Sequence, residues 1–202
     1  MRQIIAIATI LILSVSSPAQ LNSPPADSEV FTIKQSAISH SRPVSFSIGY
    51  PIDWQMFEPG SHHPVGELLT ADDELVCSFC PGPTALTVAH LTAPNLAHII
   101  IWRSDRSTAK EEAERFAASV RQRSGSYTND LFSPITTKAG DHGYLVVSRV
   151  DSEQEHALLS DFFFHVGAKG AIRISIRTSV GDSQLFENLQ NLVLQTLRFS
   201  DG

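Results

Sequence analysis

The sequence predicts a single α+β domain. Several segments have apolar residues that alternate with polar ones, the period of a half-buried β-strand. Two further segments carry apolar residues at helical spacing. The chain has 202 residues, of which 42% are hydrophobic and 18% charged. This composition is ordinary for a globular domain, and the length suffices for a sizeable core.

The first 19 residues have the pattern of a cleavable signal peptide. Arg2 precedes an apolar run from Ile4 to Leu13, and Ser17 and Ala19 place small side chains before a cleavage site. The run is about half of the 20 apolar residues that a membrane-spanning helix needs. We therefore expect an extracytoplasmic protein, periplasmic or secreted, with no membrane span after cleavage.

The chain divides into three predicted regions. Residues 1–19 are the predicted signal peptide, and residues 20–29, rich in Ser and Pro, are predicted to be a flexible leader. Residues 30–202 are predicted to form the α+β domain. The full chain has a formal net charge of −6.

The first predicted strand covers residues 44–50. Apolar residues alternate with small or polar ones from Val44 to Tyr50, and Pro51 ends the pattern. Asp53 and Trp54 would follow in a turn. We expect Trp54 to fill the edge of the core; the alternative is that both residues line a cleft.

Residues 55–73 are predicted to form a long surface loop, because they are rich in Pro and Gly and show no period. Long loops inside compact domains are often functional. Further strands are expected at 74–80, 85–90 and 97–103. The β-branched run 99–101 predicts a central strand that is buried on both faces.

The first helix is predicted to begin at Ser107 or Thr108, where Thr108 and Glu111 have the spacing of a capping box, and to end near Gly125. Four strands and a second helix are expected after it. The strands are 132–138, 144–150, 159–166 and 171–178, and the helix runs from the N-cap residue Asp182 to about Leu197.

The order of these elements resembles that of PsbP-like proteins, over about Val30 to Phe199. The residues that carry the resemblance are Phe46, Tyr50, Pro51, Trp54, Gly143, Tyr144 and Phe199. The superfamily includes the PsbP subunit of photosystem II, a Ran-binding nuclear import factor and many bacterial exported proteins. The resemblance implies an antiparallel sheet of about six strands with helices on its faces, an α-β-α sandwich, and mostly non-enzymatic adaptor or assembly roles. It carries over no catalytic residues, because fold alone does not transmit function.

Cys77 and Cys80 form a C-x-x-C pair. In an oxidising compartment we expect a disulfide between them. Two alternatives are reduced, buried thiols and a redox-active pair. A redox pair is usually found at a helix N-terminus, which Pro81 and Pro83 disfavour here.

His62 and His63 precede the cysteines, so a metal site made of His62, His63, Cys77 and Cys80 is conceivable. The competing interpretation is an exposed polar loop, since adjacent histidines usually point to different sides. No cofactor is predicted. Asp182 and Ser183 superficially resemble an esterase motif but are better explained as the start of a helix.

The sequence favours a non-enzymatic exported module that binds an extracytoplasmic protein or assists assembly, through residues 55–73 or an exposed sheet face. The alternative is a metal or small-ligand carrier that uses residues 62–80. An enzyme whose site is assembled from distant residues is a third hypothesis. Nucleic acid is an unsuitable partner, because the basic residues of 110–123 are interspersed with glutamates.

Overall fold

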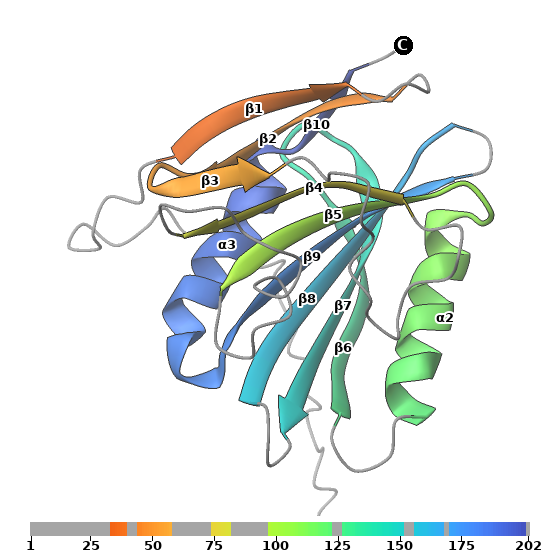
Figure 1. The fold of residues 1–202 in the computed structure, drawn as a ribbon. Coiled ribbons are helices and arrows are strands. Elements are labelled where there is room, and N and C mark those ends of the chain that lie inside the picture. Colours follow the sequence, from red (N-terminus) through yellow and green to blue (C-terminus); the bar gives the residue numbers. More distant parts are fainter. Residues whose placement is uncertain are drawn as a thin grey trace, which may run out of the picture. The chain divides into compact units, whose positions relative to one another are not determined.

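The computed structural model describes residues 33–39, 44–57, 74–81, 97–122, 127–151, 156–167 and 170–200. All of them belong to one compact unit, Phe31–Gly202. The strands are β1 (Ile33–Ser39), β2 (Ser45–Pro51), β3 (Trp54–Phe57), β4 (Glu74–Pro81), β5 (His98–Ser104), β6 (Tyr127–Thr136), β7 (His142–Asp151), β8 (His156–His165), β9 (Ala171–Ser179) and β10 (Arg198–Ser200). The α-helices are α2 (Ala109–Gln122) and α3 (Ser183–Thr196) (Figure 1).

The strands form two antiparallel sheets. The larger one has seven strands in the order β3-β4-β5-β9-β8-β7-β6, and the smaller one has the order β1-β2-β10. The α+β prediction with an antiparallel sheet is therefore confirmed, and the strand predicted at 85–90 lies outside the described residues. Among those residues, no helix is long and apolar enough to cross a membrane.

Strand β5 confirms the prediction of a strand buried on both faces. It lies between β4 and β9 in the larger sheet, and all seven of its residues are buried. Ile99 and Ile101 belong to the main core cluster, and Ile100 and Trp102 alternate with them and point to the opposite face.

The main core lies on the sheet face that α3 covers. Ile172, Ile174 and Ile176 of β9 are buried there with Leu189 and Val193 of α3. Phe46 of the smaller sheet belongs to the same cluster, so α3 contacts both sheets. The period of two predicted for 171–178 is confirmed by this arrangement.

Helix α2 covers the other face of the larger sheet, over β6, β7 and β8 (Figure 1). The predicted capping box is present: the Thr108 amide donates to Glu111 Oε2 at 2.9 Å, and the Glu111 amide donates to Thr108 Oγ1 at 3.3 Å. Gly125, the predicted stop, lies outside the described residues.

Three strands differ from the sequence prediction. The sequence predicts turn and loop for Trp54–Phe57, but these residues form β3, which pairs with β4, so residues 55–57 are not loop. Strands β1 and β10 have no counterpart in the prediction, and both pair with β2. Strands β3 and β10 have only four and three residues, so they are formed by their pairing partners rather than by a pattern of their own.

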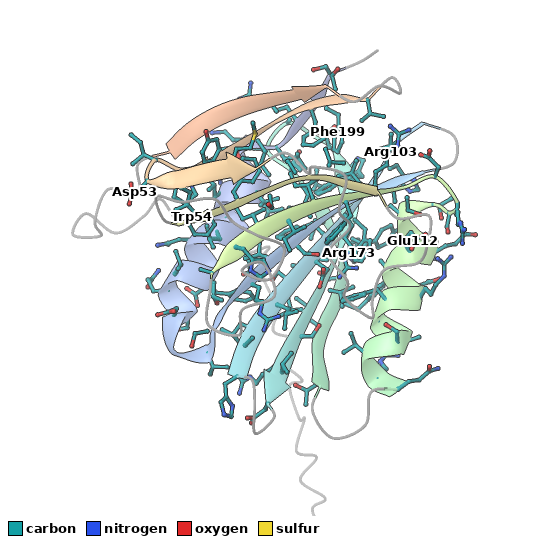
Figure 2. The ribbon with its side chains drawn as sticks, viewed as in Figure 1. Asp53, Trp54, Arg103, Glu112, Arg173 and Phe199 are labelled. Atoms are coloured by element: carbon teal, nitrogen blue, oxygen red, sulfur yellow. The ribbon has the colours of Figure 1, made fainter. Side chains whose placement is uncertain are left out.

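Trp54 fills the edge of the core, whereas Asp53 is exposed in the turn before it (Figure 2). The two side chains therefore do not line a common cleft. At the second helix, Asp182 occupies the predicted N-cap position but makes no capping hydrogen bond. A 3₁₀ turn (Val180–Asp182) precedes α3, and Ser179 caps that turn by accepting from the Gly181 amide.

Candidate functional site: an apolar patch at the β6 edge

The metal and disulfide candidates of the sequence lie in and before β4. His62 and His63 are outside the described residues, so their role stays a prediction. Cys77 is buried in the main core cluster, 1% exposed, opposite Ile101 of β5. A thiol in this position packs as a small apolar side chain.

The backbone of β4 argues against a Cys77–Cys80 disulfide. The two residues are three apart in one strand, and both pair in register with neighbouring strands. Their Cα atoms are therefore about 10 Å apart. A disulfide needs a Cα separation below about 7 Å, so the bond would require the strand to bend. Whether Cys77 and Cys80 are joined or reduced stays a prediction, and the extended geometry of the segment is the reason to expect reduced thiols.

A different surface emerges at the edge strand β6. Leu131 and Phe132 are large apolar residues with exposed fractions of 45% and 36%. They are adjacent in sequence, so their side chains lie on opposite faces of the strand. Phe132 lies on the same face as Pro134, His142 and Tyr144, and these four residues form what we call the β6–β7 patch; Leu131 projects from the other face of the edge.

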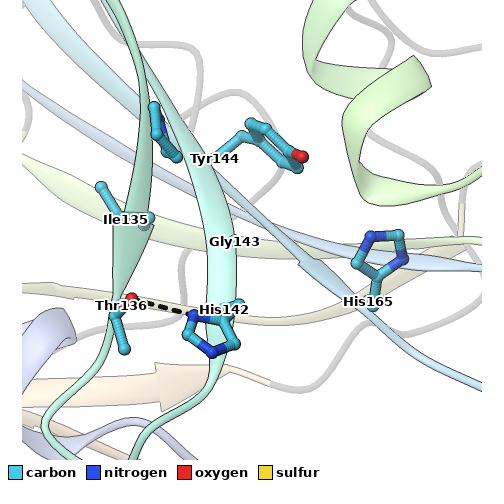
Figure 3. A pocket seen from close by; sticks show the side chains of 7 residues that line it. Ile135, Thr136, His142, Gly143, Tyr144 and His165 are labelled. Atoms are coloured by element: carbon cyan, nitrogen blue, oxygen red, sulfur yellow. Dashed lines mark hydrogen bonds between the residues drawn. The ribbon is translucent and has the colours of Figure 1, made fainter.

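An open pocket of about 350 Å³ lies within this patch. Its lining comes from β6, β7 and the end of β8 (Figure 3). The lining residues are Pro134, Ile135, Thr136, His142, Gly143, Tyr144 and His165. The pocket therefore offers ring faces and imidazole nitrogens rather than carboxylates.

Two contacts fix the walls of the pocket. The Phe132 and Tyr144 rings stack with their centroids 6.0 Å apart and an interplanar angle of 25°. Further along the same two strands, Thr136 Oγ1 lies 3.0 Å from His142 Nδ1, within hydrogen-bond distance (Figure 3). The patch is therefore an ordered surface of aromatic groups.

The edge of β6 is poorly suited to pairing with a further strand. Pro134 has no backbone N–H to donate, and the register shifts between Asn129 and Leu131. Prolines and bulges are devices by which native sheets prevent edge-to-edge addition. A partner at this edge would contact side chains instead of extending the sheet.

A buried charge lies on the same sheet face, beneath α2. Asp161 of β8 is fully buried, and its Oδ1 accepts from Arg173 Nε and Nη2, both at 2.8 Å, and from the Ser175 hydroxyl. The Arg173 guanidinium also lies 4.1 Å from the centroid of the Phe116 ring. The group is enclosed in protein, so its first role is to join β8, β9 and α2.

Sequence reasoning missed both features. The predicted strand at 132–138 includes Phe132, yet its exposure depends on β6 being an edge, which the chain order does not reveal. Asp161 lies inside the predicted strand 159–166, and its partner Arg173 follows 12 residues later. Only the β8–β9 register brings them together.

Comparison with known proteins gives a fold but no function. No protein-family model matches the chain, and no curated protein matches it. The crystal structure of LpqN, a protein involved in cell envelope biogenesis of Mycobacterium tuberculosis, is similar with a TM-score of 0.55 and 11% identity. That likeness covers 84% of this chain and 92% of LpqN.

The solution structure of cyanobacterial PsbP (CyanoP) from Synechocystis sp. PCC 6803 has a TM-score of 0.51 and 14% identity. The similarity covers 89% of this chain and 99% of CyanoP. The chain thus shares an α+β fold with both proteins. More particularly, this is the PsbP-like fold, as the sequence resemblance predicted.

Proposed function

We propose that this chain is a non-enzymatic, extracytoplasmic protein-binding or assembly module that contacts its partner through the β6–β7 patch. One observation carries the proposal: Phe132, on an edge strand, is exposed and stacks on Tyr144, which lines a pocket that also contains two histidines. Exposed apolar residues grouped beside a pocket and rimmed by polar ones are typical of interaction surfaces.

The composition of the patch supports contact with a protein. Tyrosine and other aromatic residues are enriched where binding energy concentrates, and an ordered aromatic surface loses little side-chain entropy on binding. The Phe132–Tyr144 stack provides such a surface. A partner that inserts an apolar side chain into the pocket would meet the Tyr144 ring and the imidazoles of His142 and His165.

The expected location supports the same proposal. The pattern of Arg2, the apolar run and Ala19 predicts export, and LpqN, which shares the fold, is involved in cell envelope biogenesis. An acidic net charge and a patch without carboxylates favour a protein partner over a nucleic acid.

Site-specific photo-crosslinking in the native organism tests this proposal. A photoreactive side chain at position 132 should yield one discrete adduct with an extracytoplasmic protein. Ile52 is the matched control, because it is also apolar and 44% exposed but lies in the turn between β2 and β3. The substitution His142→Glu, at an exposed residue of the patch, should abolish the adduct at 132 while leaving the melting temperature within about 2 °C, since surface changes are usually small.

Two outcomes would contradict the proposal in different ways. An adduct that forms from position 52 and not from 132 would keep protein binding but transfer the contact to the neighbourhood of residues 55–73. No adduct from either position, with the protein present at normal abundance in its compartment, would refute the protein-binding function itself.

A further inference from the structure

The two helices that cover the larger sheet are held by very different side chains. From α3, the buried residues are Phe186, Leu189, Leu192 and Val193. From α2, they are Ala109, Ala113, Phe116, Ala117 and Val120, so three of the five are alanines. Because burial energy follows the apolar area removed from water, α2 is the more weakly held cover.

The sheet beneath α2 also contains a buried charge. Asp161 is fully buried there, and its Oδ2 has no hydrogen-bond partner among the residues described. The same holds for the buried hydroxyl of Ser148 on the neighbouring strand. Buried polar groups without partners gain hydration when they are exposed, which lowers the free energy of opening on this side.

The N-terminal end of α2 is anchored more firmly than the rest. Glu112 Oε1 accepts from the hydroxyls of Ser104 and Ser107, at 3.0 and 2.7 Å, and from Arg115 Nη1 at 3.0 Å. These bonds tie the first turn of the helix to the end of β5 (Figure 2). Beyond Arg115, the buried contacts of α2 come from Phe116, Ala117 and Val120.

We propose that α2 opens from the sheet as a separate unit, pivoting on its anchored first turn, while α3 and the main core remain folded. Opening uncovers Val146, Phe163 and Tyr144, which pack against α2 in the closed state. Tyr144 already belongs to the β6–β7 patch, so opening adds Val146 and Phe163 to the side chains exposed beside it, together with the Asp161–Arg173 pair. The inference goes beyond the proposed function and does not depend on it.

Local openings of this kind are measured by native-state hydrogen exchange. In the whole protein at low urea, the α2 amides from Phe116 onward should exchange at least tenfold faster than the slowest amides of α3. Their exchange should also depend less on urea, because a local opening exposes less surface than global unfolding. Equal rates and equal urea slopes in α2 and α3 would overturn the proposal.

A pair of variants separates local from global opening. Leu189→Ala, in the main core that stays folded when α2 opens, should accelerate the slowest amides of α3 and leave the α2 amides from Phe116 onward unchanged. Val120→Ala removes a contact that both openings break, so it should accelerate α2 and α3 by similar factors. If Leu189→Ala accelerates α2 as much as α3, α2 opens only with the whole protein and the proposal fails; Ile176→Val, a smaller change in the same core, gives this readout where Leu189→Ala folds poorly.

Discussion

Gly143 of β7 occupies a position where the structure has no room for a side chain. A Cβ atom built there would lie 2.5 Å from the carbonyl oxygen of Phe163 and 2.7 Å from Cδ1 of Phe164. Real Cβ atoms essentially never come within 3.0 Å of such neighbours. The substitution Gly143→Ala therefore forces either the β8 backbone or a fully packed ring to move.

The magnitude follows from what has to move. Phe164 is 1% exposed in the main core, and Gly143 pairs with it across the β7–β8 ladder. Overpacking a filled core destabilises a protein by about 1–3 kcal/mol. A displaced ladder hydrogen bond adds about 1 kcal/mol. We expect a total of roughly 3 kcal/mol, which for a chain of this size lowers the melting temperature by about 6–12 °C.

Urea denaturation followed by circular dichroism measures this effect. Gly181→Ala is the matched control, since the nearest atom to its added Cβ, Ser179 Oγ, is 3.9 Å away. That variant should remain within about 0.5 kcal/mol of the parent protein. A loss below about 1 kcal/mol for Gly143→Ala, or equal losses for both variants, would refute the reasoning from close approach.

Two further predictions concern the buried carboxylate and the cysteines. Asp161→Asn leaves Arg173 without its buried counter-charge and should lower the free energy of unfolding by roughly 3 kcal/mol. The control Asp151→Asn, at a carboxylate that is 71% exposed, should lower it by less than about 1 kcal/mol. Equal effects would contradict the assignment of Asp161 and Arg173 as a buried ion pair. Alkylation of the unfolded, unreduced protein should label both Cys77 and Cys80, because the β4 backbone separates them. If the intact mass shows that no label was added, the two cysteines are joined and the prediction is wrong.

Much of the sheet could be predicted from the sequence, because burial imposes a period on the chain. The alternation in 171–178 and the apolar run in 99–102 correspond to β9 and β5, which are central strands with one or two buried faces. The capping box at Thr108 was predictable because both of its partners lie within one helical turn. The sequence pattern was therefore sufficient to predict an element wherever its burial repeats along the chain or its hydrogen bonds join residues of one helical turn.

The remaining features depend on contacts between distant segments. Strand β10 has only three residues and exists because Phe199 pairs with Phe46. The exposure of Leu131 follows from the order of strands in the sheet, which no single segment encodes. Asp161 could be recognised as an unusual strand residue, but its neutralisation by Arg173 is set by strand register alone.

The smaller sheet links the time at which the protein can fold to the emergence of its last residues. Strand β2 has β10 as one neighbour, and the amide of Gly49 donates to Thr196 Oγ1 at 2.8 Å across a sequence separation of 147 residues. Neither contact can form before the C-terminal segment has been synthesised. Contacts of such long range are slow to close. In a nascent chain the smaller sheet would thus stay incomplete until the segment that contains β10 has been made.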